Sequence, residues 1–326
     1  EYLQKHRALP VFDPGKSGLA GRDRWEPEAI QPPLYYWLVA ITTPDANLYD
    51  LDPLFTPNPH FLGTTWGNQN PLVPQPRQAY AALHAGRLVS LAFGVITLLS
   101  TYGLARTFAS SMVALLATAL TAFIPQFLYI STSFSNDLSI TALCSLVIWF
   151  TARELGRPLL FRRAVVLGIL IGLATLAKLG GFILVVVVPT ILLADRLWLR
   201  RRGEPAWRVT AYCAVLIGMA CLVPMPWFVR NWQVYGQPFA LPGLYSAMGE
   251  RQGLISIPEL YELLVFHWKG YWLDFSPGGV LYGPTWLYLC YSILLACAGG
   301  GLVMTWRKVA KSRPYLRLAL SWVLLY

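Results

Sequence analysis

Residues Val209–Phe228 read VTAYCAVLIGMACLVPMPWF, a run of 20 residues without a charge. A helix needs about 20 apolar residues to cross the hydrocarbon core of a bilayer, because each residue advances it by only about 1.5 Å. The rest of the chain has the same character. Of its 326 residues, 56% are hydrophobic and only 13% are charged, whereas soluble domains have about 25% charged residues. The sequence therefore predicts a protein that is embedded in lipid.

Further apolar runs lie on both sides of this one. They are Leu88–Ala105, Phe108–Ser135, Leu138–Ala152, Trp286–Trp306 and the beginning of another at Leu318–Tyr326. The run Ala164–Ala194 is long for one helix and has a single charge, Lys178, beside Gly180 and Gly181. We predict two short helices there, joined by a turn at the glycines. The expected fold class is all-α, a polytopic transmembrane helix bundle of about eight spans with the last one incomplete.

The net charge of +10 is concentrated in three short loops between apolar runs, at residues 153–163, 196–208 and 307–317. Arginine-rich short loops beside apolar spans indicate the cytoplasmic side of a membrane protein. We therefore interpret the basic charge as a determinant of topology and exclude nucleic acid as a partner. Two helices within Ala164–Ala194 keep the first two basic loops on the same side.

Alternation of the spans divides the chain into four regions. Residues 1–84 are expected to form a first outer loop, 85–228 a transmembrane bundle, 229–284 a second outer loop, and 285–326 further transmembrane helices. Within the first loop, Ile30–Thr43 is apolar but too short to span, which predicts a helix lying on the membrane surface. The chain has no starting methionine and ends within an apolar run, so we interpret it as a fragment of a longer protein.

Two acidic residues in the predicted outer regions are candidates for catalysis. Glu28 precedes Gln31, Tyr35 and Tyr36, and this mixture of polar and aromatic groups suits a sugar. An ordinary amphipathic anchor with interfacial tyrosines would give the same pattern. Asp137 lies in the short turn between two predicted spans, where a charge is costly unless it is hydrated, paired or bound to a metal. The alternative is that Asn136 or Asp137 merely caps the following helix.

Two basic residues on the same side are candidates for binding a phosphate. Lys178 lies between two apolar helices at the predicted outer rim, although it could also extend to water. Arg230 emerges where the span Val209–Phe228 meets the outer face, on the side where arginine is disfavoured. A guanidinium can bind a phosphodiester with two parallel hydrogen bonds, and Asn231 beside it adds a neutral donor.

Several stretches resemble, in the same order, the C-type membrane glycosyltransferases, a superfamily that includes protein O-mannosyltransferases and aminoarabinose transferases. The resemblance lies in Glu1–Val11, Glu28 with Gln31–Tyr36, His84 with Arg87, Ser135–Asp137, Leu176–Lys178, and Arg230–Asn231 with Tyr235–Gly236. It implies a helix bundle with interfacial helices in a large outer loop. It also implies transfer of a sugar from a polyprenyl-phosphate donor to a lipid, glycan or protein acceptor on the non-cytoplasmic face. The expected location is a bacterial plasma membrane.

The sequence departs from the family in two ways. The family's main catalytic acidic residues lie at the end of the first span, before the stretch that corresponds to Glu1. Aminoarabinose transferases have Glu-Lys where this chain has Ile30-Gln31, which argues against that subgroup. No metal ligands are predicted, although a divalent cation remains possible as a cofactor. The rival interpretations are a transporter or lipid flippase, and an assembly protein of the same fold without catalysis. Transporters place charges near the bilayer midplane, whereas here charges lie at the membrane edges.

Overall fold

The computed structural model describes Leu3 and residues 7–11, 30–43, 77–199, 205–241, 253–275 and 282–312. Over these residues the chain forms eleven α-helices and one 3-10 helix. The β pairing found there is a single isolated bridge between Asp274 and Tyr282. The prediction of an all-α helix bundle is confirmed.

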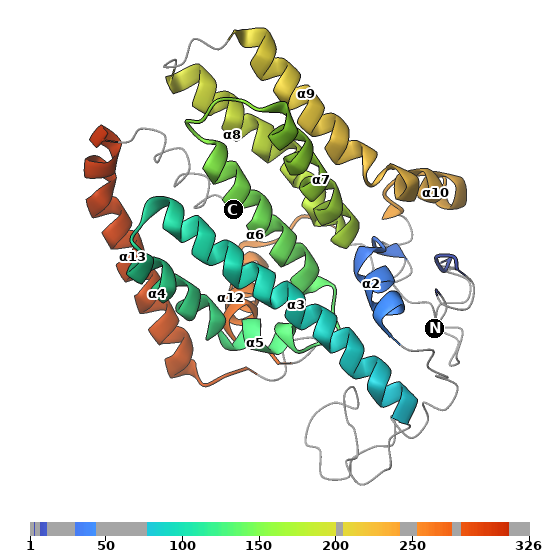
Figure 1. Ribbon diagram of the computed structural model, residues 1–326. Helices are drawn as coiled ribbons and strands as arrows, with labels where there is room; N and C mark the ends of the chain where they lie inside the picture. Colours follow the sequence, from blue (N-terminus) through green and yellow to red (C-terminus); the bar gives the residue numbers. More distant parts are fainter. Residues whose placement is uncertain are drawn as a thin grey trace.

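Figure 1 shows the arrangement of these helices. Their bounds are α2 Leu34–Thr42, α3 Arg77–Phe108, α4 Ser111–Ala122, α5 Pro125–Ser131, α6 Asp137–Glu154, α7 Phe161–Ala177, η4 Leu179–Ile183, α8 Leu184–Leu199, α9 Ala206–Leu222, α10 Met225–Tyr235, α12 Ile257–Trp272 and α13 Thr285–Ser312. The bundle is built from α3 against α6, α6 against α7, and α7 against α9. The largest buried cluster of apolar side chains lies among α6, α7, α8 and α9.

Small residues allow α7 and α9 to approach closely. A Cβ atom at Gly168 would lie 2.5 Å from the Leu216 carbonyl oxygen, and one at Gly172 would lie 2.5 Å from Cβ of Val223. Helices in membranes associate through such small residues, because lipid provides no hydrophobic force that drives them together.

The division of Ala164–Ala194 into two helices is confirmed. Helix α7 ends at Ala177, Lys178 is extended (φ −159°, ψ 142°), and η4 leads into α8. Gly181 is needed at this break, because a Cβ atom there would collide with the backbone of Ala174.

Two other predicted spans are bent. Val209–Phe228 was predicted to be one span, and within it α9 ends at Leu222 and α10 leaves it at 50°. Phe108–Ser135 divides into α4 and α5, which meet at 69°. Prolines explain both bends, since Pro224 and Pro125 have no N–H to continue the helix ladder.

Length and composition make two of the described helices able to cross a membrane, or up to four if each bent pair is one span. This number is lower than the eight that we predicted. The predicted span Leu138–Ala152 lies in α6, which has charged residues at both ends, and α7 has only 17 residues. The predicted span Leu318–Tyr326 lies outside the described residues.

A helix, α2, forms within Ile30–Thr43 as predicted, and its position on the membrane surface stays a prediction. Tyr35 and Val39 are buried against the bundle, whereas Trp37 and Ile41 are exposed. A second such helix, α12, was not predicted. Its start could have been recognised, because Ser256 and Glu259 form a reciprocal capping box.

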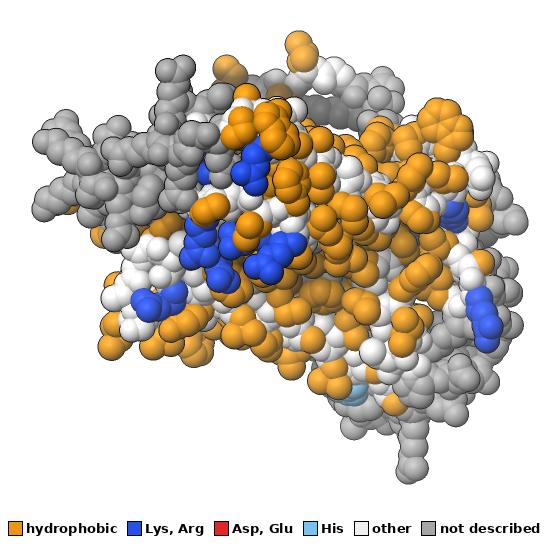
Figure 2. Space-filling model, turned by 45° about the horizontal axis from the view of Figure 1, so that its top comes forward, with side chains coloured by type: hydrophobic (Ala, Val, Ile, Leu, Met, Phe, Trp, Pro, Cys, Tyr) orange, Lys and Arg blue, Asp and Glu red, His pale blue; other side chains and the backbone are white. Residues whose placement is uncertain are grey.

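The bundle has two chemically different ends. The first helical residues of α3 and α6, the last of α7, and helices α2 and α10 lie toward one end, on the right in Figure 1. The last residues of α3 and α6 lie toward the opposite end. Figure 2, which turns the top of the molecule forward, shows Lys and Arg side chains gathered among hydrophobic ones.

Candidate functional site

The turn between α5 and α6 presents Asp137 to the end of the bundle where α7 stops. Asn136 occupies the N-cap position of α6, but its side chain makes no capping hydrogen bond. Instead the Ser135 hydroxyl accepts a hydrogen bond from the Asp137 N–H at 3.2 Å and donates to Asp137 Oδ2 at 2.8 Å. The Asp137 carboxylate is therefore left to interact with other elements, and the simple capping interpretation does not account for it.

Lys178 supplies the partner. Its Nζ donates to Asp137 Oδ1 in an ion pair between the α7–η4 break and the start of α6. The Lys178 and Asp137 side chains are 43% and 46% exposed, so both can be reached from outside the protein. An ammonium group has three donors, and no other contact of Lys178 Nζ is recorded within the described part of the chain.

The start of α2 is attached to the same turn. Asn136 Nδ2 donates to the Gln31 side-chain oxygen, which brings the amide of Gln31 beside the residue preceding Asp137. Tyr36 is partly exposed. Gln31, Asn136, Asp137 and Lys178 are thus brought together from three separate segments.

The position of Tyr35 differs from our expectation that its ring contacts a sugar. It is fully buried, its hydroxyl lies 2.9 Å from the Ser90 hydroxyl, and its ring packs edge-on against Phe134. Burial raises the pKa of the Tyr35 hydroxyl, and its hydrogen bonds with Ser90 and the Ser135 backbone only partly offset this effect. Tyr35 therefore fixes α2 to α3 as a neutral phenol.

Arg230 lies in the middle of α10. Its guanidinium donates to the carbonyl oxygens of Pro10 at 2.6 Å and Leu9 at 3.4 Å, and it stacks over the Tyr235 ring at 5.4 Å. Asn231 is fully buried and donates to the Pro238 carbonyl at 3.1 Å. This arrangement differs from our expectation that Asn231 offers a donor to a ligand, because the side chain is buried and bonded within the protein.

The structure does not bring Arg230 and Lys178 into contact. They lie at the same end of the bundle, since Phe182 in η4 contacts the ring of Phe228 on α10 at 5.9 Å. Each has its own partner, a carboxylate for Lys178 and backbone carbonyls for Arg230. A shared phosphate site remains a prediction.

The electrostatics of Asp137 follow from its partners. Burial raises its pKa, but the hydrogen bond and charge of Lys178, together with the Ser135 hydroxyl, outweigh this effect and leave the pKa of Asp137 below its usual value. Asp137 precedes the apolar run of α6 and is ionised at neutral pH.

Other candidates are less defined. Glu28 lies outside the described residues. Within the described ranges no three side chains of His, Cys, Asp or Glu gather where a metal ion would bind.

The sequence analysis did not predict the roles of Ser90 and of the carbonyls of Leu9 and Pro10. No sequence signal marks a backbone carbonyl or a small hydroxyl as a partner of a group far along the chain.

Comparison with known proteins agrees with this architecture. Neither the comparison with curated proteins nor that with solved structures gave a significant match. Residues 81–228 match the sequence model of the dolichyl-phosphate-mannose-protein mannosyltransferase family. The match begins within α3 and extends into α10, so it includes Asp137 and Lys178 but neither Gln31 nor Arg230. The match covers less than half of the chain, and together with the all-α architecture it supports the resemblance to the C-type membrane glycosyltransferase superfamily.

Proposed function

We propose that this protein transfers a sugar from a polyprenyl-phosphate donor to an acceptor at the end of the bundle that holds Asp137 and Lys178. The observation that carries the proposal is the accessible ion pair between these two residues, in a region that matches a family named for a lipid-phosphate sugar donor. The proposal places this end on the non-cytoplasmic face of a bacterial plasma membrane. The acceptor is a lipid, a glycan or a protein.

Lys178 is the proposed contact for the donor phosphate. Only one of its three ammonium donors is needed for Asp137, so others remain for phosphate oxygens. Asp137 keeps the ammonium in place through two supports, the ion pair itself and the Ser135 hydroxyl behind it. The geometry is therefore set before a donor binds, as electrostatic stabilisation of a leaving group requires.

The proposed reaction is a simple displacement at C1 of the sugar. A bond forms between the acceptor oxygen and C1 of the sugar, and the bond between C1 and the phosphate oxygen breaks. The polyprenyl phosphate leaves with the bonding electron pair, and Lys178 stabilises its added negative charge. The proton of the acceptor hydroxyl passes to a carboxylate.

The lowered pKa of Asp137 makes it a weak proton acceptor. We therefore assign it to holding Lys178 and to accepting a hydrogen bond from the acceptor hydroxyl. Glu28, three positions before Gln31, is our candidate for taking the proton. Gln31 and Tyr36 are the candidates for contacting the sugar, and Arg230 is a second candidate for the phosphate.

The experiment measures transfer of radiolabelled sugar from a panel of polyprenyl-phosphate donors, with the protein in proteoliposomes. Lys178→Gln is expected to lower transfer at least about tenfold, since a charge-assisted hydrogen bond contributes about 1.5–3 kcal/mol. Lys269→Gln is the matched control. It also removes one lysine, whose ammonium lies 4.9 Å from the centre of the Tyr282 ring, and it should leave transfer unchanged.

Equal transfer by the wild type and the Lys178→Gln variant would contradict the assignment of Lys178. Movement of labelled lipid across the bilayer with no sugar transferred from any donor would instead favour the transporter interpretation. Expression of a folded protein with neither activity would favour a scaffold.

A further inference from the structure

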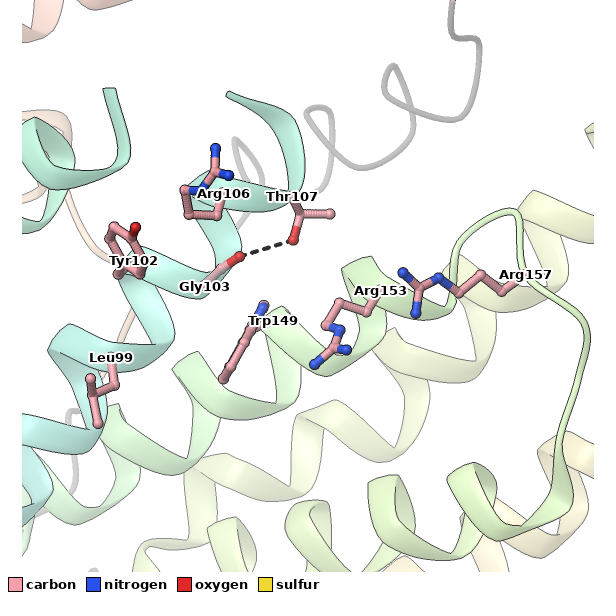
Figure 3. Close-up of a pocket in the computed structure, with 8 residues that line it drawn as sticks. All are labelled: Leu99, Tyr102, Gly103, Arg106, Thr107, Trp149, Arg153 and Arg157. Atoms are coloured by element: carbon pink, nitrogen blue, oxygen red, sulfur yellow. Dashed lines mark hydrogen bonds between the residues drawn. The ribbon is translucent and has the colours of Figure 1, made fainter. Parts of the chain in front are cut away.

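A cavity of about 740 Å³ opens at the end of the bundle opposite to Asp137, between the last turns of α3 and α6. Figure 3 shows the residues that line it. This volume lies within the range of sites for small ligands, about 300–1,000 Å³. It shares no residue with the candidate site described above.

Aromatic and apolar groups form the walls of this cavity. The Trp149 ring of α6 lies against the backbone of α3 at Gly103, where a Cβ atom would collide with it. Tyr102 and Leu99 continue the wall along α3, and the Leu99 side chain is 60% exposed. The cavity is therefore continuous with the apolar side surface of the bundle, which faces lipid if the helices span a membrane.

Three guanidinium groups surround the cavity. Arg106 comes from the last turn of α3, Arg153 from the last turn of α6, and Arg157 from the loop that follows (Figure 3). Arg106 donates to the Ala109 carbonyl at 2.8 Å, and Arg153 stacks over Trp149 at 5.6 Å from the ring centre.

The acidic residues nearby form ion pairs with other arginines. Glu154 forms an ion pair with Arg163 at 3.1 Å, and Asp195 pairs with Arg196 at 3.5 Å. Within the described ranges, none of the three arginines of the cavity is paired with a carboxylate. Their charges thus add up over the cavity instead of being neutralised.

The loop that holds Arg157 is fixed by α8. Gly156 has a positive φ of 69°, and its N–H donates to Asp195 at 3.2 Å. Arg196 donates to the Arg157 carbonyl at 2.7 Å. The Arg157 side chain extends from this loop back toward Arg153 in Figure 3.

Two general effects favour arginine at this end, namely the positive-inside rule and the negative pole of a helix C-terminus. Neither requires a cavity or an aromatic wall. Arg162 and Arg208 satisfy the positive-inside rule in the first turns of α7 and α9, where the helix pole is positive, and they do not line the cavity. The three arginines of the cavity therefore call for a further explanation.

We propose that this cavity binds the phosphate-bearing head group of an anionic membrane lipid from the leaflet next to the basic loops. Guanidinium groups bind phosphate through paired hydrogen bonds. Basic pockets between membrane helices on the cytoplasmic side are suited to such head groups. The exposed apolar surface around Leu99 accommodates the acyl chains. The site does not depend on the proposed sugar transfer.

The test compares lipid binding in nanodiscs, using spin-labelled phosphatidylglycerol as the anionic probe and spin-labelled phosphatidylcholine as the zwitterionic one. The double variant R153Q/R157Q should lower the affinity for the anionic probe at least about tenfold, because it removes charge-assisted hydrogen bonds to the phosphate, each of which contributes about tenfold or more. Binding of the zwitterionic probe should be unchanged.

The double variant R162Q/R208Q is the matched control, since it removes the same charge from the same end of the bundle. Its loss of anionic-lipid affinity is expected to be much smaller. An equal loss in both double variants would overturn the proposal, because the effect would then be general surface attraction. Displacement of the anionic probe by millimolar inorganic phosphate would overturn the lipid assignment. Melting curves of all variants, measured without the probes, should coincide.

Discussion

At the scale of the residue, the ion pair between Asp137 and Lys178 contributes little to the stability of the protein. Both side chains are nearly half exposed, and pairs of this kind contribute only about 0–1 kcal/mol. Three further interactions nevertheless fix their surroundings: the Ser135 hydroxyl, the Asn136–Gln31 bond and the glycine break after Lys178. An exposed ion pair whose surroundings are fixed in this way is typical of a site that binds a ligand.

The pH dependence of Asp137 can be tested directly. Its folded pKa is lowered, so the ionised pair stabilises the protein above the unfolded pKa of about 4 and loses this contribution as pH falls through the folded value. The difference in melting temperature between wild type and Asp137→Asn should therefore be constant from about pH 8 to pH 5 and shrink below about pH 4. Thermal melts in detergent measure it. A difference that grows on acidification would contradict the sign of the shift.

At the scale of the element, the contact between α7 and α9 determines how the bundle packs. Gly168 lies directly against the backbone of α9, so any side chain there must push two helices apart. The break after α7 depends on a second close contact, because Gly181 in η4 lies against the backbone of Ala174.

Substitution of Gly168 by Val is expected to destabilise the bundle by about 1–3 kcal/mol, the usual cost of overpacking. Gly218→Val is the matched control, since a Cβ atom at Gly218 would meet no atom within 4 Å. It should change stability by less than about 0.5 kcal/mol. Chemical denaturation in detergent gives both values. Similar losses for the two variants would show that a valine side chain on either helix, and not the close contact at Gly168, is responsible.

At the scale of the whole molecule, the two ends of the bundle have different chemistry. One end brings together the accessible pair Asp137–Lys178 and the surface helix α2. The other carries the cavity with three arginines. The positive-inside rule predicts that the arginine end faces the cytoplasm, and a sugar donor would then meet the opposite end on the outer face.

This topology can be checked by cysteine labelling in a background from which the five native cysteines have been removed. An impermeant maleimide added from outside should label a cysteine at position 254, where the native leucine is fully exposed. It should not label one at position 162 until the membrane is opened with detergent. Labelling at 162 but not at 254 in intact cells would invert the proposed orientation, and with it the side on which transfer occurs.

Several features were determined by the sequence alone. They include the all-α class, a helix within Ile30–Thr43, the division of Ala164–Ala194 at Lys178 and the clustering of basic charge in short loops. These features depend on local hydrophobicity, on glycine and on the distribution of charge, all of which can be read without knowing any contact. The prolines that cause the bends, Pro125 and Pro224, are also present in the sequence. The length of the apolar runs by itself predicts single spans there.

The tertiary structure alone decided which groups meet. The carboxylate that pairs with Lys178 lies 41 positions earlier in the sequence, and the Pro10 carbonyl that Arg230 contacts lies 220 positions away. Tyr35 is buried because α2 packs on α3, and the arginine cavity exists because two helix ends lie side by side. Periodicity and charge counts specify which elements form, whereas partners far apart in sequence are fixed only by how those elements pack. Packing depends on shape, which no local pattern encodes.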